Sequence, residues 1–81
     1  MKEAGNISHF YPRISVALVE VTNTLTVGDK ILILGSTTNF EQIVESMQIE
    51  HQNVTSAKSG QSIGLKVEKR AREGDKLYRI E

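Results

Sequence analysis

A run of four apolar residues at positions 31–34, Ile-Leu-Ile-Leu, stands between Gly28-Asp29 and Gly35. The run is too short for a buried helix of usual length, but it suits a strand that is covered on both faces. Gly28 fits a turn position that needs a positive φ, Asp29 can accept a hydrogen bond from nearby backbone, and Gly35 lets the chain turn again. We therefore expect a strand that crosses the core, with a turn at each end.

Several other short segments alternate apolar and polar side chains as strands do. Residues 14–21 are rich in β-branched side chains, and we expect a bulge that turns their two halves to opposite faces. Residues 63–67 alternate around Gly64, and residues 76–80 follow Gly74-Asp75, a second Gly-Asp turn. Short strands separated by turns predict an all-β fold, a small closed barrel of mainly antiparallel strands. The predicted core consists of Val16, Leu18, Val21, Leu25, Val27, Ile31, Ile33, Val44, Met47, Ile49, Ile63, Leu65, Val67, Leu77 and Ile80.

The segment between the apolar run and residue 50 fits two secondary structures. Phe40, Ile43, Val44 and Met47 recur at helical spacing and would share one face of a helix. Thr38 and Glu41 match the capping box that begins such a helix. Residues 45–50, however, alternate as a half-buried strand does. The overlapping positions cannot adopt both structures.

Length and composition exclude several classes of site. The 81 residues have room for one domain, residues 1–81, in which residues 1–13 form a further strand or an arm. Cysteine is absent, which excludes disulfides and thiol nucleophiles, and two histidines are too few for a histidine-built zinc site. We expect no metal and no other cofactor. Because no run has the length of a signal-peptide core or a membrane span, we expect a cytoplasmic protein without membrane contact.

The net charge is zero, but the two parts of the chain differ in sign. Residues 1–57 hold three basic and six acidic side chains, whereas residues 58–81 hold seven basic and four acidic ones. Such a basic segment can mark a surface for nucleic acid or for an acidic partner, and the alternative is a merely solvated surface. The candidate binding residues lie on and just beyond the strand at 63–67, where they should gather at one end of the barrel. They are Lys66, Lys69, Arg70 and Arg72.

Four segments, in this order, carry a resemblance to a known family: residues 23–29, 44–49, 54–65 and 74–77. Together they resemble the second domain of translational GTPases such as elongation factor Tu, and most of all the stand-alone proteins called translation elongation factor-like. The resemblance covers residues 14–81 and implies a six-stranded closed β-barrel. It also implies a strand in the disputed segment, over about residues 43–50, and a role in protein biosynthesis as a module that binds RNA or a ribonucleoprotein. If the module binds RNA, we expect the four basic residues named above to make the contacts.

The chain also departs from the complete translation factors. It has no Gly-x-x-x-x-Gly-Lys-Ser/Thr phosphate loop, and the Gly-Ser-Thr-Thr at residues 35–38 lacks the lysine that would reach the phosphates. We therefore expect that the chain alone does not bind GTP. Glu68-Lys69 stand where the resemblance to elongation factor Tu would place an Arg-Gly pair near the aminoacyl end of tRNA.

The sequence indicates a binding module and not an enzyme. Ser46 and His51 would lie on opposite faces of the expected strand, so they do not suit a nucleophile and its base, and we expect no catalytic residue. The main interpretation is a module that binds RNA or another translation component. The alternative is an accessory protein-interaction barrel that works with a separately encoded partner, because similar barrels end a family of collagenase-like peptidases, which residues 19–29 fit equally well.

Overall fold

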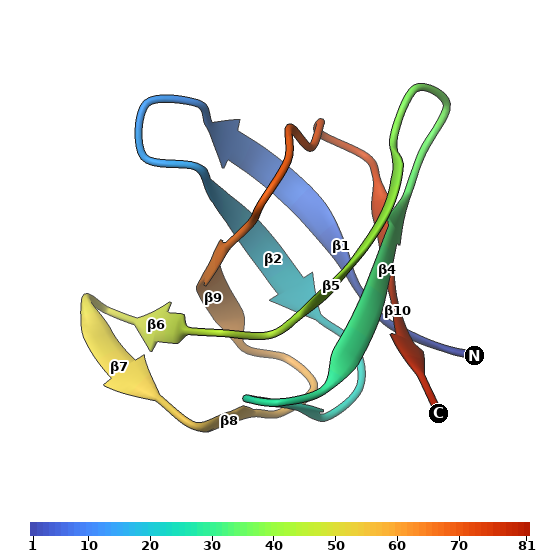
Figure 1. The fold of residues 1–81 in the computed structure, drawn as a ribbon. Helices are drawn as coiled ribbons and strands as arrows, with labels where there is room; N and C mark the ends of the chain where they lie inside the picture. The colour runs from blue at the N-terminus through green and yellow to red at the C-terminus, as the bar shows by residue number, and fades with distance from the viewer.

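The structure is a computed structural model that describes all 81 residues, and it consists of strands and turns without a helix. The strands are β1 (Lys2–Tyr11), β2 (Val16–Val21), β3 (Leu25–Thr26), β4 (Lys30–Leu34), β5 (Asn39–Ile43), β6 (Met47–Ile49), β7 (Gln52–Val54), β8 (Ser56–Ala57), β9 (Ser62–Lys66) and β10 (Lys76–Ile80). Figure 1 shows them curled around a common interior, with the two termini side by side. The predicted all-β, mainly antiparallel class is confirmed.

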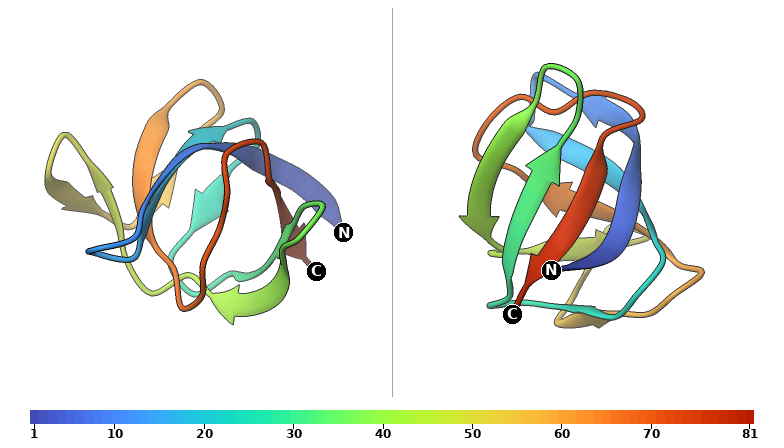
Figure 2. Two further views of the ribbon diagram at one scale, coloured as in Figure 1. Left: turned by 90° about the horizontal axis from the view of Figure 1, so that it is seen from above. Right: turned by 90° about the vertical axis from the view of Figure 1, so that its right-hand side faces the viewer.

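Eight strands form one sheet in the order β5-β4-β10-β1-β2-β9-β6-β7, while β3 and β8 form a separate two-stranded ladder. β5 and β7 are the edges of the larger sheet, so the predicted closed six-stranded barrel is wrong. Figure 2 shows how strongly the open sheet curls. The first strand, β1, pairs with both β10 and β2, so most of the N-terminal segment is an interior strand of the sheet.

The disputed segment contains two short strands and no helix. The predicted strand over about residues 43–50 is confirmed for β6 alone, and β5, which precedes it, was not expected. Phe40, Gln42 and Val44 are buried at every second position, as strand geometry requires. Because the middle one of these three is polar, the alternation is hidden in the sequence, whereas the apolar residues happen to keep helical spacing.

Gln42 joins two parts of the sheet that no strand pairing connects. Its side chain is 5% exposed, and it lies where the β5 end of the sheet meets the end of β9. Its Nε2 donates a hydrogen bond to the carbonyl oxygen of Lys66 at 3.0 Å, and its Oε1 accepts one from the backbone N–H of Glu68 at 2.8 Å. One buried amide thus satisfies a backbone acceptor and a backbone donor that a closed barrel would satisfy through its ladder.

Replacing Gln42 by leucine should therefore destabilise the domain by about 2 kcal/mol, because it leaves these two backbone groups without partners. The matched control is Gln48→Leu, since Gln48 is exposed and bonds to the side chain of Asn53. We expect that control to change the free energy of unfolding by no more than about 0.5 kcal/mol in urea denaturation. Equal losses in the two variants would contradict the bridging role of Gln42.

The core contains most of the predicted residues. Buried as predicted are Val21, Leu25, Ile31, Ile33, Val44, Met47, Ile63, Leu65, Val67 and Leu77. The prediction is wrong for Val16, Leu18, Val27 and Ile80, which are exposed or half-buried, whereas Ile49 is half-buried and packs against the core. For β2 the reason is register. The bulge lies in β1, between Ile7 and His9, so β2 alternates regularly and turns Ala17 and Val19 inward in place of Val16 and Leu18.

Three turns of the chain share one construction. In each, a glycine with positive φ stands third, and a side-chain oxygen of the fourth residue accepts the backbone N–H of the first. They span residues 26–29, 58–61 and 72–75, with φ values of 99°, 95° and 89° at their glycines. The expected repeat of the Gly-Asp turn is thus confirmed, and Gln61 fulfils in the middle turn the role that Asp29 and Asp75 have in the others.

Candidate functional site

The four basic residues of the predicted RNA site lie on β9 and in the link that follows it. Lys66 lies on β9, and its Nζ donates a hydrogen bond to the carbonyl oxygen of Ile14 at 2.9 Å. Lys69, Arg70 and Arg72 are exposed in the link between β9 and β10. Lys66 is therefore directed toward the loop between β1 and β2.

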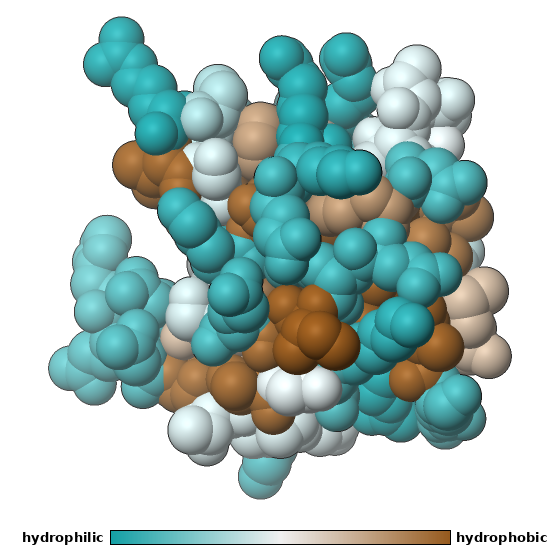
Figure 3. Space-filling model, viewed as in Figure 1, coloured by the Kyte–Doolittle hydropathy of each residue, from teal (hydrophilic) through white to brown (hydrophobic).

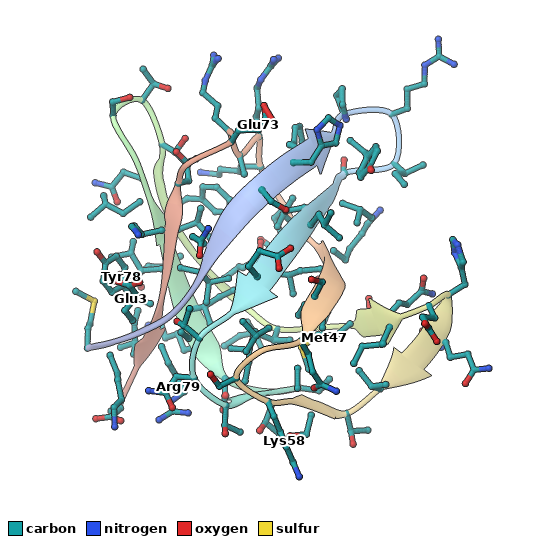
Figure 4. All side chains as sticks on the ribbon, turned by 180° about the vertical axis from the view of Figure 1, so that it is seen from behind. Glu3, Met47, Lys58, Glu73, Tyr78 and Arg79 are labelled. Carbon is teal, nitrogen blue, oxygen red and sulfur yellow. The ribbon has the colours of Figure 1, made fainter.

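Arg70 and Arg72 face the same shallow hollow at the end of the molecule where β1 ends. Ala71, between them, is 1% exposed and anchors the link to the core. The opposite wall includes His9, whose Nδ1 lies 3.8 Å from Oε1 of Glu73. Figure 4 shows Glu73 at this end and Lys58 at the other end of the molecule. The basic side chains of residues 58–81 are therefore spread over both ends of the molecule. The hollow itself is lined by basic and acidic side chains and is of mixed charge.

A second depression, which we call the outer-face groove, lies on the outside of the sheet over β2, β9 and β6. Its floor is formed by Val16 and Leu18 of β2 and by Gly64 of β9. One wall is the end of β1 with the β1–β2 loop, and the other is the β6–β7 hairpin. Figure 3 shows a hollow at the left edge between these two projections. The lining residues are Tyr11, Ile14, Val16, Leu18, Gln48, Glu50, His51, Ser62 and Gly64.

Strand register explains the groove. Leu18 pairs with Gly64, and Gly64 pairs with Gln48, so these three residues stand in one row across the outer face. Since the middle residue has no side chain, the row is low at its centre. A Cβ added at Gly64 would meet Val16 Cγ1 at 3.4 Å, which is the floor of the same groove.

Two features of the sequence belong to this groove. Residues 16–19 are apolar at outward as well as inward positions of β2, and a glycine interrupts the strand at 62–66. We interpreted that glycine as a bulge or a close backbone contact, whereas it is the low point of an apolar outer face. The register of β2 against β9, which places these features together, could not be known from local patterns.

No group of three or more His, Cys, Asp or Glu side chains is arranged to hold a metal ion. Ser46 lies in the link between β5 and β6, and His51 lies at the tip of the β6–β7 hairpin, both exposed. The backbone N–H of Gly35 donates a hydrogen bond to the carbonyl oxygen of Thr38, and the N–H of Thr38 donates one to the carbonyl oxygen of Gly35. Both N–H groups therefore have hydrogen-bond partners within the β4–β5 turn. The structure contains no helix that could span a membrane.

Comparison with known proteins links the chain to peptidases. No protein-family model matches it. An uncharacterized protease of Methanocaldococcus jannaschii is 46% identical over 77 residues, which are 94% of this chain and 19% of that protein. A collagenase of Porphyromonas gingivalis is 39% identical over 74 residues, which are 89% of this chain and 20% of the collagenase. The chain resembles one segment of larger peptidases. It spans about a fifth of the length of these curated relatives.

The solved structures agree on the fold of this peptidase-like segment. The C-terminal domain of a Geobacillus thermoleovorans protein assigned to the U32 peptidases superposes with a TM-score of 0.92. The match covers 99% of this chain and 93% of that domain at 22% sequence identity, so it shows the shared fold. A selenomethionine variant of the same domain matches with a TM-score of 0.91.

These comparisons correct the main interpretation of the sequence. The resemblance to translation elongation factors is wrong, because the curated proteins that the chain matches are a protease and a collagenase. The role in protein biosynthesis and the interpretation as an RNA-binding module are corrected with it. The findings support the alternative, a domain like those of collagenase-like peptidases. The choice of Lys66, Lys69, Arg70 and Arg72 as binding residues stays a prediction.

Proposed function

We propose that the chain is a non-catalytic accessory domain of a collagenase-like peptidase of the U32 type, and that it acts by contacting the peptidase portion. One observation carries the proposal. Almost the whole chain is similar to a segment that makes up about a fifth of a protease and of a collagenase, so the remainder of each relative is available for the peptidase chemistry. The partner of this chain would be that portion, in the same or in a separate polypeptide.

The structure supports a role without catalysis. The chain has no cysteine, and its exposed Ser46 and His51 lie on different elements, at a strand link and at a hairpin tip. Ser46 and His51 therefore do not form the nucleophile and base of a hydrolytic site. The buried polar side chains, Thr38, Gln42 and Asp75, do not supply such a pair, since Gln42 and Asp75 bond to backbone groups of their own sheet and turn.

The P. gingivalis collagenase allows a direct test of the accessory role. We would compare the intact enzyme, a variant without the 74 matching residues and a chimera in which this chain replaces them. Deletion should lower the rate of collagen cleavage about tenfold or more, because loss of a positioning contact costs that much or more. The chimera should recover most of the rate. Full activity of the deletion variant, or no recovery in a folded chimera, would contradict the proposal.

A further inference from the structure

We propose that the outer-face groove is the surface on which the peptidase portion docks, through an extended segment that places an apolar side chain over Gly64. This inference rests on the proposed function and adds the surface and the chemistry of the partner. The segment would carry an acidic side chain toward one end of the groove and a basic side chain toward the other.

Apolar side chains around the groove are uncovered. Ile14 is 57% exposed and Tyr11 is 44% exposed, and both stand next to the half-buried Val16 and Leu18 of the floor. The other exposed large apolar side chains, Val27, Leu34 and Ile43 among them, lie on separate elements. Exposed apolar side chains that adjoin an apolar depression mark an interaction surface, whereas single ones do not.

Side chains of opposite charge flank the groove at the two ends of the β2–β9 ladder. Val16 pairs with Lys66 at one end of β2, and Glu20 pairs with Ser62 at the other, four residues away, which is about 13 Å in a strand. The carboxylate of Glu20 accepts a hydrogen bond from the Ser62 hydroxyl at 2.7 Å, and Glu50 lies on the hairpin wall. Neither these carboxylates nor Lys66 form a salt bridge within the chain. An extended segment of about five residues would span this distance and meet both charges.

Backbone strain gathers at the same place. The chain has three non-glycine residues with positive φ: Ser15 at 54°, Glu50 at 50° and His51 at 65°. Ser15 lies in the loop that forms one wall, and Glu50 with His51 forms the two-residue hairpin turn of the other. Such turns usually contain Asn-Gly or a related pair, and strained residues of this kind occur preferentially at binding clamps. The strain therefore supports a ligand between the two walls.

The relatives argue for the peptidase portion as the occupant. The matching segment covers 19% of the M. jannaschii protease, so a much larger body adjoins it in that polypeptide. Both termini of this chain lie on the side of the molecule away from the β6–β7 hairpin, so neither covers the groove (Figures 1 and 2). A second copy of this chain, the other occupant, becomes an outcome of the test.

The test uses a chimera of the M. jannaschii protease in which this chain replaces the matching 77 residues. Hydrogen–deuterium exchange would be compared between the chimera and the isolated 81-residue chain, at residues 13–15 and 50–51, whose backbone lies outside the strands. We expect these amides to exchange about tenfold more slowly, or slower still, in the chimera. Ile14→Asp should abolish that protection, and the matched control Leu34→Asp, on β4, should retain it.

The remaining outcomes overturn the inference. Equal exchange in chimera and isolated chain, or new protection confined to another face, would show that the groove is not the docking surface. Protection of the isolated chain that increases with its concentration would assign the groove to a second copy. The collagenase chimera tests the accessory role separately. If that chimera recovers collagen cleavage while the groove amides gain no protection, the groove is not the docking surface, but the proposed function still stands.

Discussion

Replacing Gly35 by alanine should destabilise the domain by about 3–5 kcal/mol, although glycine to alanine is a small change. A Cβ at this position would overlap Oδ1 of Asp75 and would lie 2.6 Å from its Cγ. Asp75 is 4% exposed, and its Oδ2 accepts the backbone N–H of Arg72 at 2.8 Å, which holds the turn before β10. The methyl group would therefore displace a buried carboxylate and leave Arg72 N–H without its partner.

The matched control is Gly28→Ala. Gly28 has a φ of 99° with nothing within 4 Å of an added Cβ, so that variant carries backbone strain without overlap and should lose about 1–2 kcal/mol. Urea denaturation of the two variants measures the difference. If Gly35→Ala lost no more stability than Gly28→Ala, the close contact between Gly35 and Asp75 would not be an essential part of the fold.

Replacing Ile33 by alanine should cost about 2–5 kcal/mol, as truncation of a fully buried isoleucine does. Ile33 is fully buried on β4, where it pairs with Leu77 of β10 on one side and with Phe40 of β5 on the other. Ile43→Ala is the control, because Ile43 is 46% exposed, and its loss should be about 0.5 kcal/mol or less. An unchanged denaturation midpoint for Ile33→Ala would show that β4 does not cross the core.

Local patterns predicted the position of β4 and its Gly-Asp turn correctly, because the apolar run 31–34 and the Gly-Asp pairs act over a few residues. The expectation that this strand is covered on both faces is wrong, since Ile31 and Ile33 are buried whereas Leu34 is 37% exposed. The prediction that the sheet closes into a barrel was wrong, because closure depends on contacts between residues far apart in the sequence. The side chain of Gln42, and not a strand ladder, connects the β5 end of the sheet to the end of β9. A buried glutamine whose partners are 24 and 26 residues away leaves no local pattern in the sequence.

The functional interpretation failed because its motifs describe a fold. The Gly-Asp turns and the alternating strands, on which the resemblance to translation factors rested, are requirements of turn geometry and of a half-buried sheet. Proteins of different function can therefore share them. The outer-face groove, in contrast, depends on the pairing of Leu18 with Gly64, which the sequence alone did not determine.

Peptide-bond hydrolysis by the isolated 81-residue chain tests the non-catalytic role most directly. Fluorescently labelled collagen and casein would be incubated with the purified chain, with buffer alone and, for collagen, with the P. gingivalis collagenase as the positive control. We predict that the chain releases no more labelled peptide than buffer does, while the collagenase digests its collagen. Peptide release that co-elutes with the folded chain and disappears when the chain is unfolded in urea would contradict the account.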